Sequence, residues 1–283
     1  MSFIRRIIFT SLMVLASSYN LVASAASGAL PKQSLIAGGV AVIDAGEQAE
    51  APEIFLTDAQ GKSRTPLMLI TEPGTKANTQ RWFALAGISL KRPPEQIYVS
   101  LNGKQLTIPV GQHQYEEQHL TVKKKHVNPS EEALARIRKE AKAMRSVFET
   151  FTTSLPQPAD GPLSSPFGLQ RFFNGERRNP HSGLDIAAPR GAPITAPMSG
   201  VVVQTGNYYF NGNTVLIDHG QGLISMFCHM DKIDVEEGTY LERGEYVGAI
   251  GATGRVTGPH LHWTLSLNNA RVDPMLFLGP KPE

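Results

Sequence analysis

Residues 200–229 read GVVVQTGNYYFNGNTVLIDHGQGLISMFCH and carry the clearest structural signal in the chain. Three apolar runs, 201–205, 214–218 and 223–229, are separated by short segments that contain Asn or Gly. Runs of this length, bounded by such turn residues, are typical of β-strands joined by tight connections. The sequence therefore predicts a mostly antiparallel sheet, which similar runs at 246–250 and 262–267 extend.

The rest of the chain divides around this sheet. Residues 159–283 form the predicted sheet domain. Residues 128–158 predict a helix and linker, because Pro129 suits a first helical turn, apolar residues then recur every three or four positions, and Pro156 and Pro158 end the pattern. Residues 34–125 hold seven short β-type runs and turn signals such as Asn102-Gly103, which predict a small β-sandwich. The expected fold class is mainly β: an N-terminal β-sandwich, a connecting helix and a C-terminal antiparallel sheet domain.

Residues 1–25 have the order of a secretory signal peptide. Arg5 and Arg6 precede an apolar run, and Ala23-Ser24-Ala25 offers a small-residue cleavage site. An uncleaved membrane anchor is the alternative, although Ser17 and Ser18 interrupt the run. We expect an exported protein of the periplasm or cell envelope.

Charge and cysteine content argue against nucleic-acid binding through bulk charge and against an internal disulfide. Removal of Arg5 and Arg6 lowers the formal charge from +2 to zero, so binding of nucleic acid through bulk charge is not expected. The single cysteine, Cys228, cannot form an internal disulfide. Neighbouring side chains on a strand point to opposite faces, so we interpret Cys228 as a buried apolar residue and not as the nucleophile of a pair with His229.

Five of the eight histidines lie in the C-terminal domain. His181 and Asp185 form an H-x-x-x-D motif, in which Gly183 argues for an extended or looped segment. His260 and His262 form H-x-H, and residues two apart on a strand share a face. A carboxylate and two imidazoles suit catalytic zinc, which takes three protein ligands at ~2.0–2.2 Å and leaves a fourth position to water. Each residue alone could be an ordinary loop or core residue, so only the combination is informative.

With their flanking residues, these motifs resemble the lysostaphin/LytM-type zinc metallopeptidases, which are peptidoglycan endopeptidases. The resemblance covers residues 162–277 and includes SPFG at 165–168, HSGLDI at 181–186, GNTVLIDHG at 212–220 and GATGR at 251–255. It implies that the metal ion is Zn²⁺ and that its ligands are His181, Asp185 and His262. It also implies that His229 and His260 are the catalytic histidines.

The implied function is a zinc endopeptidase that hydrolyses peptide cross-links or stem peptides of peptidoglycan by metal-activated water. One alternative is a non-catalytic envelope regulator that activates a cell-wall amidase, and another is a module that binds the wall without cutting it. All five motif positions are filled, which favours the enzyme. Phe227 stands where such enzymes often have tyrosine, and we expect this to affect packing or a peripheral hydrogen bond but not the metal ligands. The sequence does not decide the scissile bond, the oligomeric state or whether an envelope partner regulates the protein. It also leaves open whether the N-terminal domain is inhibitory or only a spacer.

Overall fold

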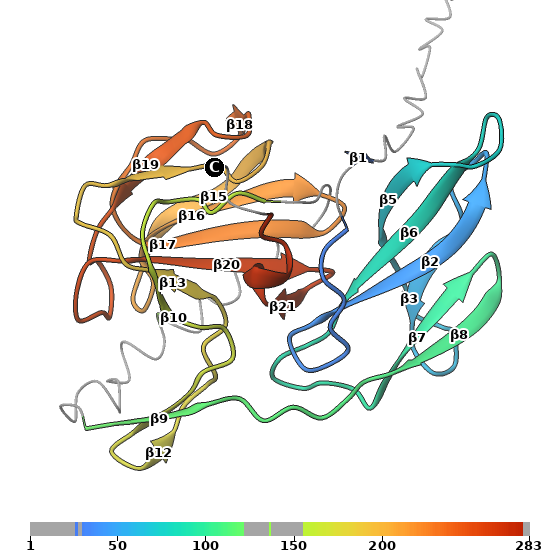
Figure 1. Ribbon diagram of the computed structural model, residues 1–283. Coiled ribbons are helices and arrows are strands. Elements are labelled where there is room, and N and C mark those ends of the chain that lie inside the picture. The colour runs from blue at the N-terminus through green and yellow to red at the C-terminus, as the bar shows by residue number, and fades with distance from the viewer. Residues whose placement is uncertain (1–25, 28–29, 122–135, 137–154, 280–283) are drawn as a thin grey trace, which may run out of the picture.

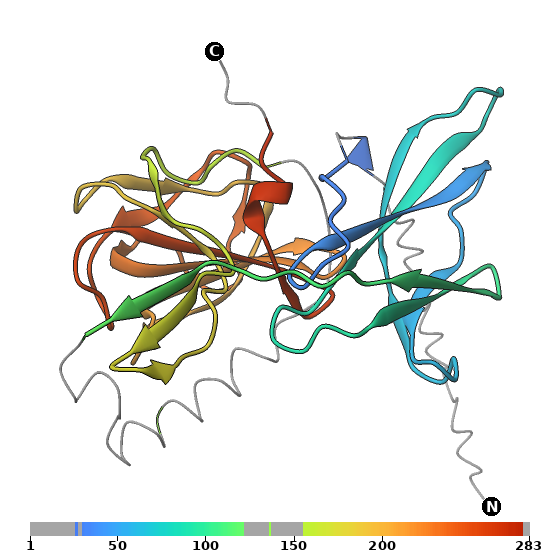
Figure 2. The ribbon, with the colours of Figure 1, turned by 60° about the horizontal axis from the view of Figure 1, so that its bottom comes forward.

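The computed structural model describes residues 26–27, 30–121, 136 and 155–279. Within these residues the secondary structure is almost entirely β, arranged in two lobes that lie side by side in both views (Figures 1 and 2). The mainly β fold class is thus confirmed. The predicted signal peptide and most of the predicted helix at 128–158 lie outside the described residues. The described ranges contain no helix with the length and hydropathy that a membrane span needs.

The N-terminal lobe is a sandwich of two four-stranded sheets. The first contains, in sheet order, β1 (Ala26–Ser27), β5 (Met68–Pro73), β6 (Gln80–Gly87) and β2 (Val40–Gln48). The second contains β4 (Arg64–Pro66), β3 (Ile54–Thr57), β7 (Gln96–Leu101) and β8 (Lys104–Pro109). A small core of residues such as Ala41, Ala84, Ile97 and Val99 fills the space between them.

The turn between β7 and β8 shows how local sequence sets this lobe. Asn102 and Gly103 have φ angles of 48° and 79°, and Leu101 pairs with Lys104 across the turn. Positive φ at both central residues is what the favoured two-residue hairpin requires. The predicted hairpin is therefore present.

The C-terminal lobe is built on a ten-stranded sheet. Its main path runs β10 (Leu163–Ser165), β13 (Leu184–Ile186), β20 (Leu261–Leu267), β17 (Leu223–Ile233), β16 (Gly212–Gly220), β15 (Gly200–Tyr208) and β18 (Tyr240–Leu241). Three more strands complete it: β19 (Tyr246–Ile250) pairs with β17 and with β14 (Pro193–Thr195), and β21 (Ala270–Val272) pairs with β20. The 3₁₀ turn η1 (Pro274–Leu276) follows β21.

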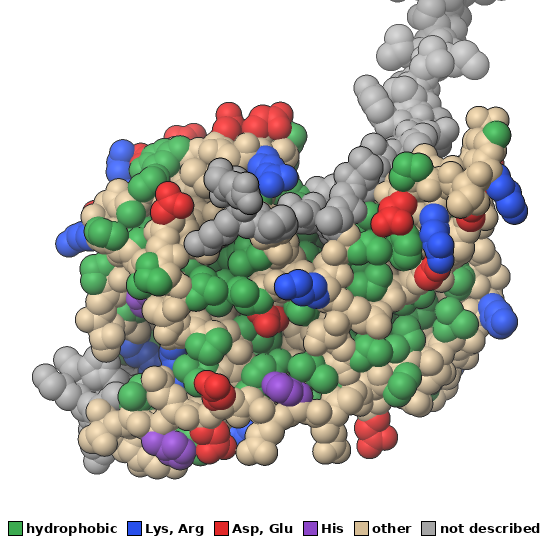
Figure 3. Space-filling model, viewed as in Figure 1, with side chains coloured by type: hydrophobic (Ala, Val, Ile, Leu, Met, Phe, Trp, Pro, Cys, Tyr) green, Lys and Arg blue, Asp and Glu red, His purple; other side chains and the backbone are tan. Residues whose placement is uncertain are grey.

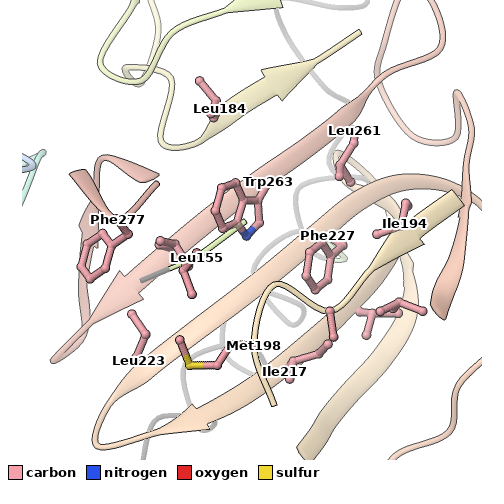
Figure 4. Close-up of a cluster of buried hydrophobic side chains, with 14 of the residues drawn as sticks. Leu155, Leu184, Ile194, Met198, Ile217, Leu223, Phe227, Leu261, Trp263 and Phe277 are labelled. Atoms are coloured by element: carbon pink, nitrogen blue, oxygen red, sulfur yellow. The ribbon is translucent and has the colours of Figure 1, made fainter. Parts of the chain in front are cut away.

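The core of this lobe lies against the central strands. Trp263 on β20 is paired in register with Phe227 on β17, and both side chains are fully buried. Figure 4 shows them among other apolar side chains, including Leu184 on β13 and Ile194 on β14. This core holds β13, β20 and β17 in fixed positions relative to one another.

The same core extends into the N-terminal lobe. Because successive strand residues point to opposite faces, Leu85 on β6 faces away from the sandwich interior, which its neighbours Ala84 and Ala86 fill. Leu85 belongs instead to the cluster that contains Leu265 and Val272 of the C-terminal lobe. The two lobes thus share apolar packing.

A third, three-stranded sheet differs from expectation. It contains β12 (Glu176–Arg177), β11 (Gln170–Phe173) and β9 (Glu117–Leu120). We expect the β-type runs of residues 34–125 to belong to the sandwich, but β9 pairs in parallel with β11, and the His119 ring stacks on Phe172 with centroids 4.3 Å apart. Parallel pairing of segments distant in sequence has no turn between them, so the local sequence carries no signal for it.

Candidate metal centre and active site

Two neighbouring strands and the segment before them bring together the residues of the H-x-x-x-D and H-x-H motifs. In the antiparallel pair β13–β20, Asp185 lies directly opposite His262, so both side chains project from the same face. His181 lies in the non-helical segment before β13, as Gly183 led us to expect. A Cβ atom on Gly183 would lie 2.7 Å from Nε2 of His262. The glycine therefore allows His262 to lie close to this segment.

The donor atoms of the three residues converge. Nε2 of His181 lies 3.0 Å from both Oδ1 of Asp185 and Nδ1 of His262, and those last two atoms are 2.8 Å apart. Ligands of a tetrahedral zinc ion with bonds of ~2.0–2.1 Å are roughly 3.3 Å from one another. The separations observed in the protein are close to that value. The arrangement can therefore hold a small divalent cation after a slight opening.

The outer nitrogen of each imidazole is bonded to the scaffold. Nδ1 of His181 lies 2.7 Å from the carbonyl oxygen of Pro166, and Nε2 of His262 lies 3.0 Å from Oγ1 of Thr264. A carbonyl only accepts, so the Nδ1–H of His181 donates and its Nε2 keeps a lone pair directed at the site. Such outer bonds fix the ring orientation and tautomer of metal-binding histidines.

Asp185 is buried and remains ionised. Burial opposes ionisation, but the adjacent imidazoles of His181 and His262 outweigh it and hold the pKa of Asp185 well below its usual range. Its second oxygen, Oδ2, lies 3.4 Å from Nη2 of Arg171, which also donates to Oγ of Ser165 at 3.1 Å. The carboxylate thus offers Oδ1 to the site while Arg171 contacts Oδ2.

Two further histidines lie beside this group. Nε2 of His260 is 3.9 Å from Oδ1 of Asp185, and the rings of His260 and His229 have centroids 4.9 Å apart. Nδ1 of His260 donates to the carbonyl of Gly258 at 2.9 Å, and Nδ1 of His229 donates to the carbonyl of Thr253 at 3.0 Å. In both rings Nε2 is therefore the nitrogen with the lone pair.

A β-bulge orients His229. In β17, Cys228 and His229 together lie against a single residue of β16, and His229 has a φ angle of 62°. A left-handed conformation is uncommon for a residue other than glycine, and bulges redirect side chains near active sites. Burial, followed by the charges of His262 and His260, lowers the pKa of His229 to about 3. The ring is therefore neutral at neutral pH, and its Nε2 lone pair can accept a hydrogen bond.

The structure places His219 away from these residues. Its ring nitrogens bond to the carbonyl of Ser199 at 3.1 Å and to Oγ of Ser225 at 2.8 Å, and burial lowers its pKa to about 4. Phe227 and Cys228 are also buried in the lobe. The buried positions of Phe227 and Cys228 agree with the packing roles that the sequence predicts for them.

Sequence reasoning missed the outer contacts of the site. Thr264 lies two residues after His262 on β20, so strand periodicity would place it on the same face and could have identified it. Arg171 had no comparable signal, because it reaches Asp185 from a different sheet. The carbonyl of Pro166 is a backbone group and leaves no trace in the sequence.

The candidate site lies in the part of the chain that matches a known protein family. The model of peptidase family M23 matches residues 179–274, a range that contains all five predicted site residues. A crystal structure from Pseudomonas aeruginosa, described as a peptidase M23, is 40% identical to this chain with a TM-score of 0.68. The likeness covers 87% of this chain and 95% of that one.

Curated relatives match over a shorter range. The peptidoglycan DD-endopeptidase ShyA of Vibrio cholerae is 40% identical over 128 residues, which cover 43% of this chain and 30% of the relative. The DD-carboxypeptidase/endopeptidase Mpg of Neisseria meningitidis is 37% identical over 121 residues, which cover 43% of this chain and 28% of the relative. The match thus spans less than a third of the length of these two relatives.

Proposed function

Because the chain belongs to peptidase family M23, we propose that it is a zinc-dependent endopeptidase that hydrolyses peptide cross-links or stem peptides of bacterial peptidoglycan. The observation that carries the proposal is the convergence of donor atoms from His181, Asp185 and His262, which all lie within 4.8 Å of one another. The names of the relatives ShyA and Mpg support the substrate class.

The donor set fits zinc. Two imidazoles and one carboxylate leave one position of a four-coordinate zinc ion open, as catalytic zinc sites require. His181, Asp185 and His262 would hold the ion. When bound, zinc supplies an acidified water and polarises the scissile carbonyl.

His229 and His260 would move the proton. In each ring the Nδ1–H is engaged by a backbone carbonyl, so Nε2 is free to accept a proton from the attacking water. Once protonated, the same nitrogen becomes a donor, which can stabilise the developing oxyanion and then protonate the leaving amine. His260 lies nearer to Asp185, so we assign the first proton transfer to it and a supporting role to His229.

The experiment compares His260→Ala with His262→Ala. We expect His260→Ala to bind about one zinc per chain but to release cross-linked muropeptides at least ~100-fold more slowly, because general acid–base groups contribute about that much. We expect His262→Ala to lose the metal. Elemental analysis and mass spectrometry of fragments from defined cell walls measure both. His113→Ala, which removes an exposed histidine of the N-terminal lobe, is the control.

Three results would count against the proposal. Full wall cleavage by His260→Ala would remove the catalytic assignment. A wild-type protein that binds zinc and wall fragments but cuts none would favour the amidase regulator or the wall-binding module. Wall binding undiminished by a chelator would favour the module in particular.

The same proposal extends to location and organisation. Residues 1–25 have the pattern of a signal peptide, and peptidoglycan lies outside the cytoplasmic membrane, so we place the activity in the periplasm or envelope. We propose 34–125 as the N-terminal domain and 159–283 as the peptidase domain. The strand β9, from the first of these segments, contributes to the sheet that carries Arg171.

A further inference from the structure

Three arginines lie beside the candidate metal centre, and the proposed hydrolysis does not use them. Arg171 on β11 contacts Asp185, and Arg178, just after β12, donates its backbone N–H to the carbonyl of Arg171 at 2.9 Å. Arg255 lies in the loop 251–260, which ends at His260. The three guanidinium groups therefore come from two separate segments that both border the site.

Two phenyl rings hold the guanidinium groups of Arg178 and Arg255. The guanidinium carbon of Arg255 is 4.4 Å from the ring centroid of Phe210 and 5.6 Å from that of Phe173. The guanidinium carbon of Arg178 is 5.9 Å from the Phe173 centroid. Both distances to Phe173 are within the range of a cation–π contact, so one ring positions two cations. The guanidinium groups of Arg178 and Arg255 thus lie beside the same phenyl ring.

Among the residues that the structure describes, basic side chains outnumber acidic ones in this cluster. Burial lowers the pKa of Arg255, and the charges of Arg178 and Arg171 lower it further, which shows that the three groups lie within electrostatic reach of one another. Glu176 pairs with Arg178 on the exposed side, and Asp185 belongs to the metal-binding group. In the space-filling view, basic side chains are visible in a hollow of this lobe, below β10 and β13 (Figure 3). Like charges placed together in a partly buried site favour an anionic ligand.

We propose that Arg171, Arg178 and Arg255 form a subsite for a free carboxylate of the substrate, on the leaving-group side of the scissile amide. The inference rests on the proposed function. A residue that ends a peptide, or a diamino diacid that enters a cross-link through the amine beside its second carboxylate, keeps a free carboxylate carbon two covalent bonds from the scissile nitrogen. That carboxylate must lie close to the metal centre, which Arg171 borders. Guanidinium groups bind carboxylates through paired hydrogen bonds.

The test uses two matched peptides that differ only in the leaving residue, which ends in a carboxylate or in a carboxamide. We expect the wild type to prefer the acid by about 10- to 100-fold in kcat/KM, the range for a hydrogen bond to a charged group. Arg255→Met and Arg178→Met keep an apolar stem on the phenyl rings and remove the charge. Each should lower kcat/KM for the acid by about tenfold and leave the amide rate unchanged. Arg255→Lys should retain part of the preference.

Arg243→Met is the matched control, because Arg243 lies between β18 and β19, far from β13 in the sheet order. Equal losses on both peptides in Arg255→Met would show that the arginines only pack against the rings, and would overturn the subsite. Equal wild-type rates on the acid and the amide would also overturn the subsite, but they would not count against the proposed hydrolysis. Calorimetric titration of metal-free protein with both peptides tests the subsite separately from hydrolysis. Tighter binding of the acid, lost in Arg255→Met, would support the subsite even if no peptide were cleaved.

Discussion

His262 is held on both sides of its ring. Nδ1 faces Asp185 and His181, and Nε2 lies 3.0 Å from the hydroxyl of Thr264. Nδ1 needs its lone pair to bind a cation, so the ring proton must reside on Nε2 and be donated to Thr264. Thr264 is fully buried, so a water molecule from the surface cannot replace its hydroxyl. We infer that this one hydroxyl maintains the metal-binding tautomer.

Thr264→Val tests this role, because valine keeps the shape of threonine but accepts no hydrogen bond. We expect zinc affinity to fall by about 10- to 100-fold, the usual effect of removing an outer partner of a ligand. Competition with a chromophoric chelator measures the affinity. Thr264→Ser should retain it, and so should Ser266→Ala, which alters another buried hydroxyl on β20. An unchanged affinity in Thr264→Val would mean that the scaffold orients His262 without this bond.

The residues of the site differ in how far the sequence could predict them. The H-x-x-x-D and H-x-H spacings, with the family resemblance, identified the side chains that the structure brings together. Thr264 follows from strand periodicity once β20 is recognised. Arg171 and the left-handed backbone of His229 depend on pairings between separate strands, which no spacing along the chain records.

At the scale of elements, β9 connects the N-terminal lobe to the β11–β12 hairpin beside the site. It pairs in parallel with β11, and the backbone N–H of Gln170 donates to the carbonyl of Glu116 at 2.8 Å. Arg171 and Phe173 lie on β11, and Arg178 follows in the same hairpin. An isolated two-stranded hairpin is only marginally stable in water. We therefore expect β9 to keep the β11–β12 hairpin ordered.

Gln118→Pro in the middle of β9 tests this dependence, because proline lacks the N–H of a paired strand and is poorly tolerated there. We expect faster amide hydrogen exchange in Gln170–Phe173, with little change in β2, β5 and β6. Exchange measured by mass spectrometry reports each segment. Gln114→Pro, outside the strands, is the control. Unchanged protection of β11 in Gln118→Pro would show that the hairpin is ordered without β9.

The elements themselves were largely predictable. The runs within residues 200–229 became β15, β16 and β17, and Asn102-Gly103 forms the turn of the β7–β8 hairpin. These succeed because alternating apolar residues and turn chemistry are local properties. The parallel pair β9–β11 and the packing of one lobe on the other depend on contacts between distant segments, so the sequence alone did not specify them.

At the scale of the whole molecule, apolar packing joins the two lobes. Met68 and Leu85 of the N-terminal sheet belong to the same buried cluster as Leu265 and Val272. A Cβ atom on Gly87 would lie 2.5 Å from the carbonyl oxygen of Leu267, so the lobes approach closely at β6. Lobes that share a core should unfold together, because separating them would expose apolar surface on both.

The two tryptophans allow this coupling to be measured, since Trp82 lies on β6 in the N-terminal lobe and Trp263 on β20 in the C-terminal lobe. In Trp263→Phe the fluorescence reports the sandwich, and in Trp82→Phe it reports the peptidase sheet. Within each single-tryptophan protein, we expect the fluorescence midpoint in urea to coincide with that of far-UV circular dichroism, which follows both lobes.

Leu85→Ala should lower the free energy of unfolding by about 2–5 kcal/mol, the usual cost of truncating a buried leucine. When Leu85→Ala is added to each single-tryptophan protein, the urea midpoints of both proteins should decrease by a similar amount, because Leu85 packs into the shared core. A shift of the Trp82 signal alone would show that the lobes fold independently and that the peptidase sheet does not need the sandwich for its stability.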